Sequence, residues 1–120
     1  MAEAQPVGVW WDAVRVPASV GERALRLLGE QTGAVIADPP GIRLYWLIGT
    51  GAADAWDHGA LQPVHLLRAH SFLVVPPAHR VTGPGVHWRL RPTADRRLTE
   101  PRALHTALRI ALTLHTQETP

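Results

Sequence analysis

The segment over residues 71–88 constrains the fold more than any other part of the chain; it reads SFLVVPPAHRVTGPGVHW. An apolar run ends at Pro76 and Pro77, whose rings fix the backbone and remove two hydrogen-bond donors from a sheet. A Gly-Pro-Gly turn at Gly83–Gly85 then leads into a second apolar run that ends at Trp88. This spacing predicts two short strands separated by an irregular connection, and therefore a β-rich fold with many breaks.

Size and composition predict a single globular domain that spans residues 1–120. Apolar residues make up 46% of the chain and charged residues 18%, which is typical of globular proteins and not of disordered ones. Because cysteine is absent, we expect neither a disulfide nor a thiolate metal site. The chain shows no signal-peptide pattern and no apolar run of membrane-spanning length, so we expect a cytoplasmic protein that does not bind a membrane.

Charge is distributed unevenly around a net value of +2. Residues 1–60 carry seven acids and four arginines, whereas residues 61–120 carry three acids and eight arginines. A basic second half is compatible with an anionic partner, although a solvated surface is the commoner meaning in a chain of this size.

Two patterns near the start predict a strand followed by a helix. Apolar residues dominate and alternate over residues 7–16, which predicts a largely buried strand. Ser19 and Glu22 match a capping box at the start of a helix over residues 19–31, and Gly33 would stop that helix. The expected buried stripe of this helix consists of Val20, Ala24, Leu27 and Leu28.

The remaining patterns predict further strands and a closing helix. Residues 34–36 and 42–48 flank a Pro- and Gly-rich turn, which indicates a hairpin. Further strands are expected at residues 64–67, 71–75 and 86–90. Thr99 is expected to cap a helix of about 16 residues whose apolar stripe is Leu104, Leu108, Ala111 and Leu112. The order predicts an α+β fold in which two helices pack on one face of a mainly antiparallel sheet.

Three segments resemble the primase/polymerase domain of bifunctional primase-polymerases, in the archaeo-eukaryotic primase superfamily. Residues 71–88 are similar to that family's GGYVVAPPSxHPSGxxYxW, and residues 40–46 resemble its GGxHLYF. Within the first expected strand, residues 11–14 (Trp-Asp-Ala-Val) resemble the place of the family's Asp-x-Asp. The resemblance covers residues 9–90 and implies a primase/polymerase-like fold.

The polar positions that catalysis needs in that family differ in this chain. The family's two carboxylates hold a pair of divalent ions for nucleotidyl transfer. Asp12 matches the first carboxylate, but Val14 stands at the second position and cannot bind a metal. Arg43 stands where the family has histidine, and His65 stands where it usually has an acid. The resemblance therefore implies a retained scaffold with no catalytic residues, no bound metal and no cofactor.

The leading hypothesis is a non-catalytic binding or regulatory module that engages a protein partner. Its residual cleft is expected to be lined by Asp12, Arg43, Tyr45 and His65. Trp10 and Trp11 are adjacent, so in a strand they would point to opposite faces, and at least one becomes a candidate for a protein interface. An open sheet edge would also allow two copies to pair as a homodimer.

Two alternatives remain open at this point. The basic second half predicts a nucleic-acid or anion contact made by Arg80, Trp88, Arg89, Arg91, Arg96 and Arg97. Within that set, Arg89 and Arg91 would share one face if their strand continued. The second alternative is a metal-dependent nucleotidyl transferase in which Asp12 and Asp38 are recruited to hold the metal. The seven histidines show no metal-binding spacing.

Overall fold

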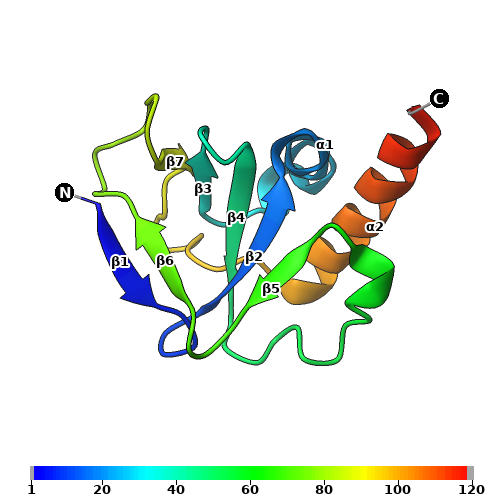
Figure 1. Ribbon diagram of the computed structural model, residues 1–120, viewed down its shortest axis with the longest axis horizontal. Helices are drawn as coiled ribbons and strands as arrows, with labels where there is room; N and C mark the ends of the chain where they lie inside the picture. Colours follow the sequence, from blue (N-terminus) through cyan, green and yellow to red (C-terminus); the bar gives the residue numbers. More distant parts are fainter. Residues whose placement is uncertain (1, 119–120) are drawn as a thin grey trace.

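A computed structural model describes the backbone of residues 2–118 and the side chains of residues 2–114. The protein is an α+β fold with three layers (Figure 1). A five-stranded antiparallel sheet forms the middle layer, two helices cover one of its faces, and a two-stranded ribbon lies on the other side. Among the described residues, no helix has the length and apolar character needed to cross a membrane.

The two sheets account for all seven strands of the described chain. In the five-stranded sheet the order is β5-β2-β4-β3-β7, and every neighbouring pair is antiparallel. These strands are β2 (Asp12–Pro17), β3 (Val35–Asp38), β4 (Arg43–Ile48), β5 (His65–Leu67) and β7 (His87–Leu90). The ribbon pairs β1 (Glu3–Pro6) with β6 (Phe72–Val75). The hairpin predicted from residues 34–48 is confirmed as β3 and β4.

The helical layer consists of α1 (Ala18–Leu28) and α2 (Pro101–Glu118), with short 3₁₀ turns at η1 (Gly29–Gln31) and η2 (Gly59–Leu61). The prediction that both helices lie on one face of the sheet is confirmed by the main core cluster. That cluster joins the even-numbered residues of β4 to the inner faces of both helices. Its largest members include Trp46, Ile48, Leu61, Leu104 and Leu108.

Trp46 is the largest fully buried side chain of the helix-side core. Its indole Nε1–H donates a hydrogen bond to Thr32 Oγ1 at 3.0 Å, so the one polar group of this ring is paired in the interior. Thr32 itself is 6% exposed and donates through its hydroxyl to the Gly33 carbonyl at 3.1 Å. The bond ties the loop after α1 to the central strand.

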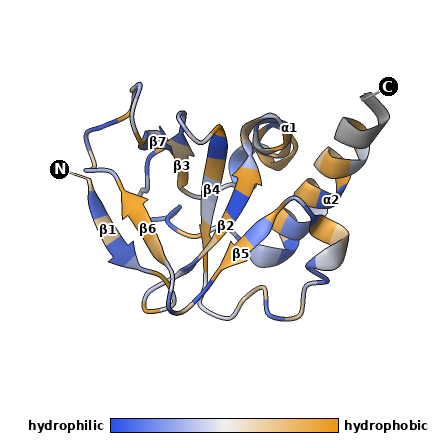
Figure 2. Cartoon of the chain, viewed as in Figure 1, coloured by the Kyte–Doolittle hydropathy of each residue, from blue (hydrophilic) through white to orange (hydrophobic). Residues whose placement is uncertain are grey.

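A second core lies on the opposite face, between the sheet and the ribbon. It consists of Val7, Ala13, Ala34, Ile36, Tyr45, Leu47, Leu73 and Trp88. The ribbon also carries apolar residues on its outer side, where Phe72 is 67% and Val74 is 42% exposed. Strand β6 is accordingly hydrophobic along its whole length (Figure 2).

The predicted strand over residues 7–16 is wrong in its first half, because strand β2 begins only at Asp12. Residues 7–11 form a tight turn that connects the ribbon to the sheet. Gly8 has a φ of 91°, and its N–H donates to the Trp11 carbonyl at 2.8 Å. Glycine adopts this left-handed conformation without the steric cost of a Cβ. Strand β1 was not expected from the sequence.

The predicted capping box of α1 is also wrong. The helix begins at Ala18, directly after the last residue of β2, and no side chain caps it. Ser19 is exposed within its first turn. The helix ends before Gly29, which has a φ of 55°, rather than at Gly33. Leu25 is buried on the inner stripe in place of Leu27, which is 45% exposed.

Helix α2 is capped by Glu100 and not by the predicted Thr99. The Glu100 carboxylate accepts the N–H groups of Arg102 at 3.1 Å and Ala103 at 2.7 Å. Thr99 is 2% exposed, and its hydroxyl oxygen accepts the Gly33 N–H at 2.8 Å. The Thr99 side chain therefore makes a tertiary hydrogen bond instead of the local helix cap that the sequence pattern predicted.

Replacing Thr32 with valine tests the buried bond to Trp46. The change nearly preserves shape but leaves the indole N–H without its acceptor, so we expect the free energy of unfolding to fall by about 1–3 kcal/mol. Urea denaturation measures this loss. Thr113→Val is the control, because the Thr113 hydroxyl donates to the Arg109 carbonyl on the exposed side of α2. Equal losses in the two variants would contradict a special role for the buried bond.

Candidate binding groove

The four residues of the predicted cleft do not share one surface. Tyr45 belongs to the core on the ribbon side, and strand pairing through β2 places His65 in the same row. Arg43 has the same parity along β4 and lies exposed at its start. Asp12 lies two positions before Val14 in β2 and therefore shares its face, which packs in the helix-side core, opposite to the face of Tyr45. The prediction of one cleft containing all four residues is therefore corrected.

Asp12 has a structural role at the beginning of β2. Its side chain is 2% exposed, and Oδ2 accepts the Gly51 N–H at 2.9 Å, which holds the glycine-rich loop after β4. Its Oδ1 atom has no hydrogen-bond partner among the described residues. Asp38 accepts the Gly41 N–H at 3.3 Å within the β3–β4 turn. Among the described residues, no three acids or histidines form a group that could hold a metal ion.

The basic stretch predicted to bind an anion is divided between the two sides of the sheet. Arg89 points to the helical layer, where its Nε and Nη2 donate to the Glu22 carboxylate at 3.1 and 3.0 Å. These hydrogen bonds raise the pKa of Arg89 above its ordinary value; burial opposes the rise and the negative charge of Glu22 adds to it. Trp88 lies on the ribbon side. Strand β7 ends at Leu90, so the expected shared face of Arg89 and Arg91 does not form.

Arg97 is the arginine of that stretch that joins an aromatic cluster. It lies beside Trp10, Trp11 and Trp88 in a groove of about 520 Å³ on the ribbon side, which we call the tryptophan groove. Pro92, Leu98, Gln5, Leu47 and Val75 complete its lining. Two surfaces that the sequence suggested separately, a tryptophan interface and a basic patch, therefore meet in one place. Arg80, Arg91 and Arg96 are exposed outside this lining.

Trp88 forms the floor of the tryptophan groove. Only 5% of it is exposed, and its Nε1–H donates to the Pro76 carbonyl at 3.1 Å. Its backbone N–H donates to the Arg80 carbonyl at 2.8 Å, and in the sheet it pairs with Ile36. Packing in the ribbon-side core and the bond to Pro76 hold the Trp88 ring, and the backbone bonds hold its strand. The floor is therefore ordered before anything binds.

One rim of the groove is the turn that carries Trp10 and Trp11. Because this turn replaces the expected strand, the two rings do not point to opposite faces, and both line the groove. Trp10 is 79% exposed, whereas Trp11 is half-buried against the ribbon-side core. The Val7 N–H donates to the Ser71 carbonyl at 2.9 Å and anchors the turn to the ribbon.

The other rim is the segment around Arg97 and Leu98. The Ala34 N–H donates to the Arg97 carbonyl at 3.4 Å, and the Thr99 N–H donates to the Leu47 carbonyl at 2.9 Å. The segment passes so close to Gly33 that a Cβ there would lie 2.8 Å from the Leu98 carbonyl carbon. This rim was not predicted, because the segment was interpreted from its sequence only as a basic stretch.

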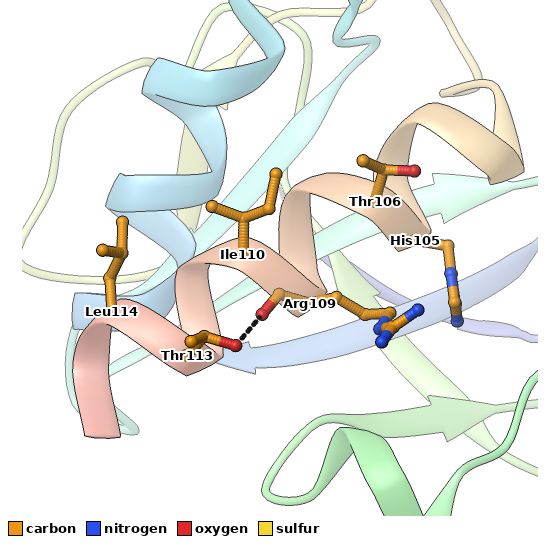
Figure 3. Close-up of a pocket in the computed structure, with 6 residues that line it drawn as sticks. All are labelled: His105, Thr106, Arg109, Ile110, Thr113 and Leu114. Carbon is orange, nitrogen blue, oxygen red and sulfur yellow. Dashed lines mark hydrogen bonds between the residues drawn. The ribbon is translucent and has the colours of Figure 1, made fainter. Parts of the chain in front are cut away.

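A second hollow lies along α2 but offers a weaker site (Figure 3). It has a volume of about 420 Å³, and a single helix supplies its lining. The lining residues are His105, Thr106, Arg109, Ile110, Thr113 and Leu114. A binding site usually gathers polar groups from several elements around an apolar wall. The tryptophan groove has that organisation and the α2 hollow does not.

Comparisons with known proteins assign this chain to no family. No protein-family model matches the chain, and no similar curated protein or solved structure was found. The tryptophan groove combines two accessible indoles, an aromatic floor and one guanidinium group.

Replacing Gly33 with alanine tests how the Leu98 rim is held. The new methyl group would collide with the backbone of Leu98, so we expect the free energy of unfolding to fall by about 1–3 kcal/mol as the rim is displaced. Gly85→Ala is the control, since a Cβ there meets nothing within 4 Å. Thermal and urea denaturation compare the two. A Gly33→Ala protein as stable as the Gly85→Ala protein would show that the close approach is unimportant.

Proposed function

We propose that the chain is a non-catalytic binding module on a primase/polymerase-like scaffold, and that it engages a protein partner through the tryptophan groove. The observation that carries the proposal is Trp10, 79% exposed at the rim of a groove whose floor is a second, rigid tryptophan. Large aromatic side chains that surround a pocket are the residues that contribute most to protein interfaces. Contiguous apolar patches on a protein surface mark interaction sites, and here Trp10 lies with Trp11 in the lining of one groove.

The charge of the groove favours a protein over a nucleic acid. Its lining is mainly apolar and carries one guanidinium group, that of Arg97. Nucleic-acid affinity depends on neutralising several phosphates at once. Arg89, which the sequence placed in the same basic patch, already pairs with Glu22 on the other side of the sheet. Arg80, Arg91 and Arg96 are exposed and could contact phosphates, so nucleic-acid binding is the competing function.

The position of Asp12 supports a role without catalysis. A nucleotidyl transferase would need at least two carboxylates around its metal ions. Asp12 is buried and engaged with the Gly51 N–H, and the neighbouring inward position on its strand is Val14. Nothing in the tryptophan groove supplies an acid to replace them, since its lining contains no aspartate or glutamate.

Photo-crosslinking in the native host tests the proposed function. A photoreactive benzoylphenylalanine at Leu98, which is 44% exposed on the groove rim, should give an adduct with a specific protein. The matched control position is Leu27, which is 45% exposed but lies on α1 in the helical layer. We expect the adduct from position 98 to disappear on Trp10→Ala and to be missing from position 27.

Two outcomes would contradict the proposal. The same adducts from both positions would mean that the groove has no special affinity for a protein. A nuclease-sensitive adduct, together with oligonucleotide affinity that falls steeply with salt and falls again on Arg91→Ala with Arg96→Ala, would establish nucleic-acid binding instead.

A further inference from the structure

The polar side chains that line the tryptophan groove offer almost only hydrogen-bond donors. The indole nitrogens of Trp10 and Trp11 and the guanidinium of Arg97 can only donate. Among the described residues, none of these three side chains forms a hydrogen bond or ion pair, whereas the Trp88 indole is paired with the Pro76 carbonyl. Gln5 is the one lining side chain that carries an acceptor. A segment that fits this groove therefore brings acceptors and few donors.

Of the regular backbone conformations, polyproline II meets this condition best. A helix satisfies its own carbonyls, and an ordinary extended strand brings as many N–H donors as carbonyls. A proline-rich segment has no N–H at its prolines and leaves its carbonyls open, because polyproline II has no internal hydrogen bonds. Its conformation is already ordered, so binding costs little conformational entropy.

The apolar part of the groove fits the same segment. Trp10, Trp11 and Trp88 come from two elements and leave flat indole surfaces around a rigid floor. Proline rings dock against aromatic walls of this kind in several recognition modules. Arg97 stands at the rim with no acidic neighbour among the lining residues, so it offers an ion pair to an acid beside the prolines.

Resting on the proposed function, we infer that the tryptophan groove binds a proline-rich segment of the partner in the polyproline II conformation, with an acidic residue next to it that pairs with Arg97. The partner's carbonyls accept from the two free indole N–H groups, and its proline rings pack against the accessible rings of Trp10 and Trp11 above Trp88. The alternative occupant is single-stranded nucleic acid, which also stacks on aromatic rings and offers acceptors.

Titration with synthetic probes tests this inference. A decaproline peptide that ends in glutamate should give a saturable change in tryptophan emission, and a Gly-Ser peptide with the same glutamate should not. Trp10→Ala or Trp11→Ala should weaken binding by about ten-fold or more, as loss of a tryptophan hot spot does. Leu27→Ala should bind like wild type. Circular dichroism confirms that each variant is folded.

A charge reversal tests the part assigned to Arg97. Arg97→Glu should weaken binding of the glutamate-ended probe several-fold and strengthen binding of a lysine-ended one. The new carboxylate repels a glutamate and attracts a lysine. If Arg97→Glu changed the affinity for both probes by the same factor, Arg97 would not pair with an acidic residue of the partner.

The result that overturns the whole inference is a folded protein that shows no saturable binding of the decaproline probe. A cross-link from position 98 to a segment without proline, identified by mass spectrometry, would overturn it too. In both cases a specific adduct at position 98 would leave the proposed function standing. If the specific adduct at position 98 were missing as well, both the inference and the proposed function would be wrong. Tight binding of oligothymidylate in place of the peptide would assign the groove to nucleic acid.

Discussion

Burial of strand β4 on both of its faces is the constraint on which the rest of the structure depends. Its even-numbered residues pack under the helices, and its odd-numbered residues pack under the ribbon. All positions from Leu44 to Ile48 are buried. A strand with two apolar faces requires a cover on each side, so the chain cannot stop at a sheet with one helical layer. The ribbon and the loops around it provide the second cover, and the tryptophan groove forms where that cover is incomplete.

The end of β4 also joins the two cores. The Leu47 carbonyl accepts the Thr99 N–H, while the Trp46 side chain donates to Thr32 on the helix side. Thr99 in turn binds Gly33, next to Thr32 in the chain. A short network of hydrogen bonds thus positions the start of α2 and the groove rim together. The rim is accordingly part of the packed body of the domain and not an independent loop.

Sequence reasoning recovered the elements whose local signals agree with their tertiary environment. The β3–β4 hairpin and both helices were predicted because apolar periodicity and turn residues indicate the same structure. Strand β1 was missed because Glu3–Pro6 has neither β-branched nor aromatic residues, and it becomes a strand only by pairing with β6. Thr99 was misassigned because its tertiary partner lies 66 positions away in the chain.

The candidate site was only partly predictable for a related reason. Trp10, Trp11, Trp88 and Arg97 were each identified from the sequence, but as two separate surfaces, because only the tertiary fold brings a turn and a distant strand together. Asp12 was expected in one cleft with Arg43, Tyr45 and His65 because of its resemblance to a catalytic motif. Strand periodicity shows that Asp12 shares a face with Val14 and not with Tyr45's partner Arg15, but only the fold shows that the helices cover this face.

The ribbon has a thermodynamic consequence for whatever occupies the groove. A two-stranded antiparallel pair is barely stable alone, and this one keeps Phe72 and Val74 in contact with solvent. Yet Gln5 and Val75, one from each of its strands, belong to the groove wall. Occupancy and local order are therefore linked equilibria: opening of the ribbon lowers the affinity, and a bound molecule suppresses that opening by the same factor.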